Sequence, residues 1–211
     1  ARYAMGMFGS TSPSYLILRS LDAANAYIDD DYPERLRLFI ERTDELKRSL
    51  SAAEWVVCVS DPLRITLYTP PRGTEGLSLL AYLEENGVFC EYASPEHLVM
   101  MLTPENTEEE LEKIKSLLIS YEKRPPQIPP SFTLPEAERV MSVRDAALAP
   151  SEMIPSADAA GRVLASPCVS CPPAVSCAVS GERLSAGHIR IMEHYGIKTA
   201  RVVCDADEMH G

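Results

Sequence analysis

Hydroxyl side chains gather near the start of the chain, in the stretch GSTSPSY at residues 9–15, which directly precedes an apolar run. Ser12 can cap a helix that begins here, and Pro13 suits its first turn because the first turn does not need the N–H that proline lacks. Two interpretations are open. The hydroxyls serve only to cap the helix, or they join the unpaired N–H groups of its N-terminus in binding an anion such as phosphate.

A second candidate site is the C-x-x-C pair of Cys168 and Cys171, which Cys177 follows six residues later. Thiolates at this spacing can bind zinc. A structural zinc site usually offers a second close pair of ligands, which this sequence does not supply. Metal binding by these three cysteines is therefore the weaker alternative, and small buried or loop cysteines are the default.

The histidines do not form a catalytic group in the sequence. His97, His188, His194 and His210 lie apart, and six residues on one predicted helix place His188 and His194 on different faces. No phosphate-binding loop, dinucleotide fingerprint or nucleophile elbow is present. We therefore expect no catalytic residue in this chain.

Charge and hydropathy exclude several classes of partner. The net charge is −11 and no dense cluster of Lys and Arg occurs, so we expect no nucleic-acid binding. The apolar runs are too short to cross a bilayer, and the N-terminus lacks the charged and apolar regions of a signal peptide. These features predict a cytoplasmic protein without membrane contact.

Hydrophobic periodicity predicts the elements that position these residues. The first half should begin with a jointed pair of helices at residues 12–28 and 33–50. Four strands should follow at residues 55–59, 63–68, 88–92 and 97–102. Two further helices should lie among them, at residues 74–86 and 107–121. The last of these helices has the clearest start, a capping box from Thr107 to Glu110.

A proline-rich stretch at residues 124–130 predicts a linker. Beyond it we expect short helices at residues 142–148 and 156–160 and then a Cys-, Ser- and Pro-rich loop at residues 166–180. A longer helix at residues 185–195 and a strand at residues 197–204 should follow.

Ordered along the chain, several segments resemble those of the bacterial ornithine/lysine/arginine decarboxylases, which are pyridoxal-phosphate enzymes. The matching segments are FGSTSPSYLIL at residues 8–18, DPLRIT at 61–66, GTEG at 73–76, LEENGV at 83–88, EHLVM at 96–100, ADAAGRV at 157–163 and SGER at 180–183. The resemblance covers nearly the whole chain, to about residue 203.

This resemblance implies an α/β (α+β) fold in four parts. Interdomain helices at residues 1–50 would join a cofactor domain that is missing here, and residues 51–123 would form the small domain of an aminotransferase-type fold. A linker at residues 124–130 would lead to the decarboxylase C-terminal domain at residues 131–211. The Schiff-base lysine would lie in the missing domain, since the family's His-Lys pair does not occur in this sequence.

The resemblance also implies roles for particular residues. Ser10, Thr11 and Ser12 would lie at a homodimer interface and offer hydroxyls to the pyridoxal phosphate of the neighbouring subunit. Glu182 would lie near the entrance for a basic substrate, which would be lysine, ornithine or arginine. We expect this chain alone to be inactive and to bind no cofactor.

A second hypothesis is a non-catalytic regulatory or interaction module derived from such an enzyme. Zinc bound by Cys168, Cys171 and Cys177 would stabilise it.

Overall fold

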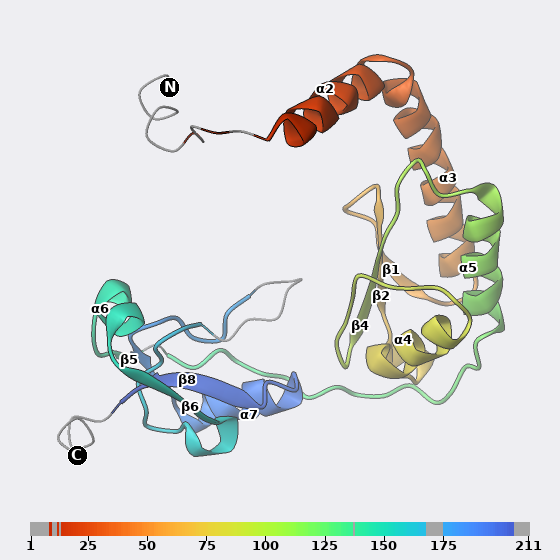
Figure 1. Ribbon diagram of the computed structural model, residues 1–211. Helices are drawn as coiled ribbons and strands as arrows, with labels where there is room; N and C mark the ends of the chain where they lie inside the picture. The colour runs from red at the N-terminus through yellow and green to blue at the C-terminus, as the bar shows by residue number, and fades with distance from the viewer. Residues whose placement is uncertain (1–8, 10–11, 13, 137, 168–174, 205–211) are drawn as a thin grey trace.

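The structure is a computed structural model that describes residues 9, 12, 14–136, 138–167 and 175–204. Its elements form two units, each with its own core, which we call the N-terminal unit (residues 14–121) and the C-terminal unit (residues 138–204). Residues 122–136 join them without helix or strand. Figure 1 shows the chain as an open curve, with helix α2 at one end and the C-terminal unit at the other.

The predicted jointed helix is confirmed as α2 (Tyr15–Asp29) and α3 (Tyr32–Ala52). α3 buries Phe39, Leu46 and Leu50 on one face. The predicted start of α2 was wrong, because its N-cap residue is Ser14 and not Ser12, and Ser14 makes no side-chain cap hydrogen bond.

The N-terminal unit is built around a four-stranded antiparallel sheet of order β1-β2-β4-β3. Its strands are β1 (Val56–Cys58), β2 (Arg64–Tyr68), β3 (Tyr92–Ala93) and β4 (His97–Met101). Helices α3, α4 (Gly76–Glu85) and α5 (Glu108–Ser120) lie on one side of this sheet (Figure 1), and a short 3-10 helix spans Pro70–Arg72. Buried Ile65 and Leu67 alternate along β2 with residues of the opposite face, as a half-covered sheet requires.

Other boundaries in this unit test the sequence predictions. The capping box of Thr107 and Glu110 is confirmed. The predicted strand at 88–92 was wrong, since only Tyr92–Ala93 pairs with β4. α4 begins at Gly76 and Thr74 does not cap it, because the buried Thr74 hydroxyl hydrogen-bonds the Tyr121 hydroxyl at 3.0 Å instead.

The C-terminal unit contains two small antiparallel sheets, β5-β7 and β6-β8. Its elements are β5 (Glu138–Arg139), α6 (Val143–Leu148), β6 (Ser151–Pro155), a 3-10 helix at Ser156–Asp158, β7 (Glu182–Arg183), α7 (Ala186–His194) and β8 (Thr199–Val203). Helix α7 and strand β8 confirm the predictions. The short strands β5, β6 and β7 were not predicted, and a 3-10 turn replaces the helix predicted at 156–160.

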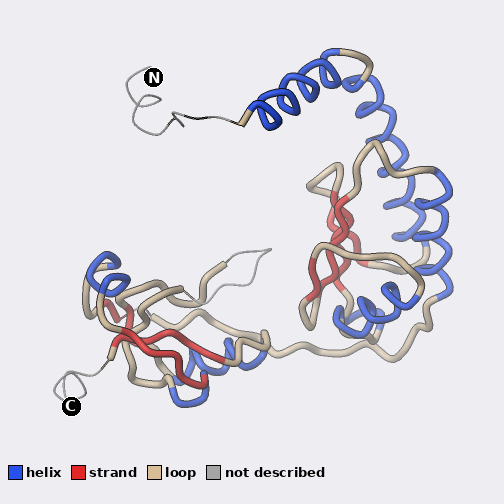
Figure 2. The backbone as a smooth tube through the Cα atoms, in the orientation of Figure 1, coloured by secondary structure: helices blue, strands red, loops and turns tan. Residues whose placement is uncertain are grey.

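The segment between the units follows the surface of the N-terminal unit before it leaves (Figure 2). Its backbone donates hydrogen bonds from Arg124 to Arg72 (3.1 Å) and from Gln127 to Pro70 (2.9 Å). Across the described part of the chain, no helix has the length and apolar character needed to span a membrane.

Candidate functional site

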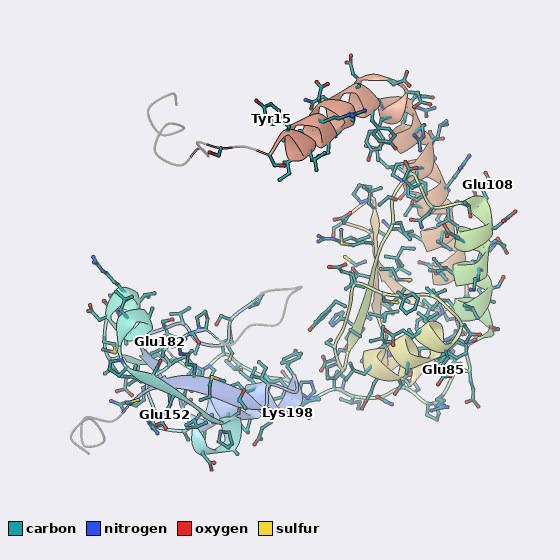
Figure 3. The ribbon with its side chains drawn as sticks, in the orientation of Figure 1. Tyr15, Glu85, Glu108, Glu152, Glu182 and Lys198 are labelled. Carbon is teal, nitrogen blue, oxygen red and sulfur yellow. The ribbon has the colours of Figure 1, made fainter. Side chains whose placement is uncertain are left out.

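The predicted anion-binding stretch lies at the free end of α2. Ser12 is exposed, whereas Ser10 and Thr11 lie outside the described residues. Tyr15, at the first position of the helix, is 87% exposed, and Figure 3 shows it far from the C-terminal unit. Ser14 does not cap α2 with its side chain, and N–H groups of a first helical turn are the donors that can meet an anion.

α2 presents an apolar surface that this chain leaves uncovered. None of its fifteen residues, all within the described part, is buried. The exposed large apolar side chains of this surface are Tyr15, Leu16, Ile17, Leu18, Leu21, Tyr27 and Ile28. So many exposed large apolar side chains on one helix are typical of a docking site.

A three-residue cluster fixes how α2 leaves the N-terminal unit. Arg35 of α3 donates to Glu105 at 2.6 Å and to the Tyr27 hydroxyl at 3.1 Å. The Tyr27 hydroxyl also donates to Glu105, which belongs to the loop between β4 and α5, and this hydrogen bond raises the pKa of Tyr27. The cluster therefore links α2 and α3 to the loop between β4 and α5.

A buried pair of titratable side chains joins the two units. Glu96, in the turn before β4, hydrogen-bonds through Oε1 to Nε2 of His194 at the end of α7. The Glu96 side chain is 9% exposed and that of His194 is 18% exposed. This hydrogen bond joins two residues that lie in different units.

The surroundings of this pair hold it in place. The ring centroids of Phe132 and Tyr195 each lie 4.9 Å from the ring centroid of His194. The second Glu96 oxygen, Oε2, is buried and has no hydrogen-bond partner among the described residues. The sequence analysis treated the histidines as separate and missed this pair, since Glu96 and His194 lie 98 residues apart.

Glu182 lies on β7, where its carboxylate accepts a hydrogen bond from the backbone N–H of Val179 at 2.9 Å. The side chain is thus fixed over its own turn, and Figure 3 shows it in the C-terminal unit. Its proposed place at a substrate entrance stays a prediction.

One of the three cysteines considered as metal ligands lies in the described part of the chain, and the buried His188 caps a helix. Cys177 is half-buried with a free thiol, and Cys168 and Cys171 lie outside the described residues. Within the described part no group of three His, Cys, Asp or Glu could hold a metal ion. His188 is buried, and its Nδ1 accepts from the Ser185 backbone N–H at 3.0 Å, which makes it a helix-capping residue.

Sequence comparison finds similar proteins over most of this chain. An uncharacterized protein of Bacillus subtilis, YaaO, is 31% identical over 196 residues, which is 83% of this chain and 39% of that protein. An arginine decarboxylase of Halalkalibacterium halodurans is 24% identical over 204 residues, which is 88% of this chain and 42% of that protein. No family model matches the chain.

Comparison of folds finds solved structures with the same fold over most of this chain. The constitutive lysine decarboxylase of E. coli matches with a TM-score of 0.70 at 15% identity, over 95% of this chain and 44% of that one. The lysine decarboxylase LdcF of Francisella novicida matches with a TM-score of 0.71 at 13% identity, over 96% of this chain and 44% of that one. The chain thus spans about two-fifths of the length of its curated relatives.

Proposed function

We propose that this chain, a relative of the bacterial lysine and arginine decarboxylases, forms the C-terminal portion of a pyridoxal-phosphate decarboxylase of basic amino acids. The observation that carries the proposal is the agreement of sequence and fold over nearly the whole chain. The chemistry would belong to residues of the longer enzyme. The part described here would position the cofactor, the neighbouring subunit and the active-site entrance.

The exposed start of α2 fits the phosphate end of pyridoxal phosphate. Ser12 is exposed there, the helix N-terminus carries a partial positive charge, and the Ser14 side chain makes no cap hydrogen bond. Ser12, with Ser10 and Thr11 beside it in the sequence, would hold the phosphate from across a homodimer interface. When bound, the cofactor supplies an electron sink for the loss of carbon dioxide.

The apolar surface of α2 would pack on the cofactor domain or on the second subunit. Full burial of one Leu or Ile side chain contributes about 1.5–3 kcal/mol, and α2 exposes several such side chains. The cluster of Tyr27, Arg35 and Glu105 would set the angle at which this surface meets its partner.

The C-terminal unit would help to close the active-site entrance. The Glu96–His194 pair would hold it against the N-terminal unit. Glu182 would contribute negative charge for a cationic substrate, because opposite charges attract over several ångströms.

The cofactor test compares the full-length protein that contains this chain with residues 1–211 alone. We expect added pyridoxal phosphate to give the visible absorbance of a lysine-bound cofactor only in the full-length protein. Turnover of lysine, ornithine or arginine by residues 1–211 alone would refute the proposal that the catalytic residues lie in the rest of the longer enzyme.

The docking role of α2 is tested by Leu21→Asp in the full-length protein, with Leu148→Asp as the control. Both leucines are exposed in this chain, at 56% and 75%, so neither change disturbs a core of the described residues. Analytical ultracentrifugation should show that Leu21→Asp alone weakens dimer formation. Equal behaviour of the two variants would contradict a docked α2.

A further inference from the structure

A cleft with a volume of about 690 Å³ lies between the two units. Ligand sites commonly span about 300–1,000 Å³, so a small molecule fits. One wall is the sheet face opposite the helices, with Arg64, Thr66 and Val99. The other wall includes Ile191 of α7 and Ile197, which follows it.

Most of the cleft surface is apolar or aromatic. Its rings come from both units and from the segment between them: Tyr92, His97, Phe132 and Tyr195. Planar side chains of this kind favour stacking with a planar ligand.

One lining residue carries a permanent charge. The Arg64 guanidinium makes no hydrogen bond within the described part of the chain, and its nearest carboxylate oxygen is Asp61 Oδ2 at 3.7 Å. The other Asp61 oxygen accepts from the backbone N–H groups of Leu63 and Arg64. Arg64 therefore keeps donors available for an anionic group, which guanidinium recognises well.

The titratable side chains that line the cleft add no second positive charge. Burial lowers the pKa of His97 and raises the pKa values of Cys177 and Tyr195, so each is neutral near pH 7. The Glu96 carboxylate lies close enough to act on both His97 and Tyr195. It disfavours a ligand with a second negative charge at that end of the cleft.

We propose that this cleft binds a small ligand with a planar apolar body and a single anionic group, with the anion at Arg64 and the planar body between the sheet face and α7. The proposal goes beyond the decarboxylase function, because the apolar and aromatic lining calls for a planar apolar body, which lysine, ornithine and arginine lack. A planar aromatic carboxylate or sulfonate has the required chemistry.

The test uses two probes of nearly equal shape, naphthalene-1-sulfonate and the neutral naphthalene-1-sulfonamide, in calorimetric titrations of the full-length protein. The wild type should bind the sulfonate more tightly. Arg64→Gln should weaken sulfonate binding about tenfold, the range of one charge-assisted hydrogen bond, and leave sulfonamide binding unchanged. Arg48→Gln, at an exposed position on α3, is the matched control and should change neither.

A second variant tests the position of the planar body. Val99→Trp fills the cleft from the sheet side and should abolish binding of both probes, while circular dichroism confirms that the variant folds. The proposal is overturned if the wild type binds neither probe, which would mean that another part of the full-length protein fills the cleft. It is also overturned if Arg64→Gln and Arg48→Gln have equal effects, or if Val99→Trp binds as the wild type does.

Discussion

Replacing His194 by alanine should release the C-terminal unit from the N-terminal unit without unfolding either core. The change removes the hydrogen-bond partner of Glu96 Oε1 and leaves a carboxylate that is 9% exposed, with its other oxygen already unpaired among the described residues. Breaking a buried pair costs about 3–5 kcal/mol, and the 18% exposure of His194 reduces this to about 2–3 kcal/mol. That loss corresponds to a 30- to 150-fold rise, roughly, in the undocked population.

Limited proteolysis at residues 122–136 measures this population, because cleavage follows transient opening when reclosing is fast. Glu193→Ala, an exposed change on the same helix, is the control and should cleave as the wild type does. Glu96→Gln combined with His194→Ala should recover part of the loss, because a neutral amide costs less to bury unpaired.

Two results would refute this reasoning. The protease could cut His194→Ala no faster than Glu193→Ala, which would mean that the pair does not hold the units together. The double variant could show the sum of the effects that Glu96→Gln and His194→Ala have singly, which would mean that Glu96 and His194 are not coupled.

Three further predictions concern the cores and the thiols. Burial lowers the pKa of His188, so the C-terminal unit has its full stability above the unfolded value of about 6.5 and loses stability as pH falls through the lower folded value. His188→Asn keeps an acceptor for the helix cap and should flatten this pH dependence of stability in urea titrations from about pH 7.5 to 5. Burial raises the pKa of Cys90 to about 11, whereas a hydrogen bond from Ser60 lowers the pKa of the exposed Cys58. Iodoacetamide at about pH 8 should therefore modify Cys58 at least about a hundredfold faster than Cys90, with the rates followed by mass spectrometry. Similar rates would contradict both pKa shifts. A Cβ at Gly76 would lie 2.1 Å from the His97 carbonyl oxygen, so Gly76→Ala should lower the free energy of unfolding by about 3 kcal/mol or more. Gly196→Ala, where the space is open but φ is +69°, should lower it by about 1 kcal/mol. Thermal melts that rank the two variants in the opposite order would show that the turn at residues 94–97 moves to accept the added methyl group.

Local signals predicted the helices well, because each leaves a pattern within a few residues. The capping box at Thr107 and the apolar spacing in α3 depend on neighbours three and four residues apart. The start of α4 failed for the opposite reason. Thr74 has the right residue type for a cap, but its hydroxyl bonds Tyr121, 47 residues away.

Contacts between distant segments account for the rest of the differences. The strands β5 and β7 are each two residues long and exist only because Glu138 and Arg139 pair with residues 182–183. The Glu96–His194 pair likewise requires the fold of both units. The resemblance to the decarboxylases could be read from ordered segments, and the comparisons support it, but the cleft could not be predicted without knowing how the units meet.

Release of labelled carbon dioxide is the most direct test of the decarboxylase proposal. The full-length protein would be incubated with pyridoxal phosphate and, separately, with carboxyl-labelled lysine, arginine or ornithine. We predict release from at least one of these basic amino acids, together with the matching amine, and none from carboxyl-labelled leucine, which matches them in backbone but carries no basic group. Absence of release from all three basic amino acids, in protein that has bound the cofactor, would contradict the proposal.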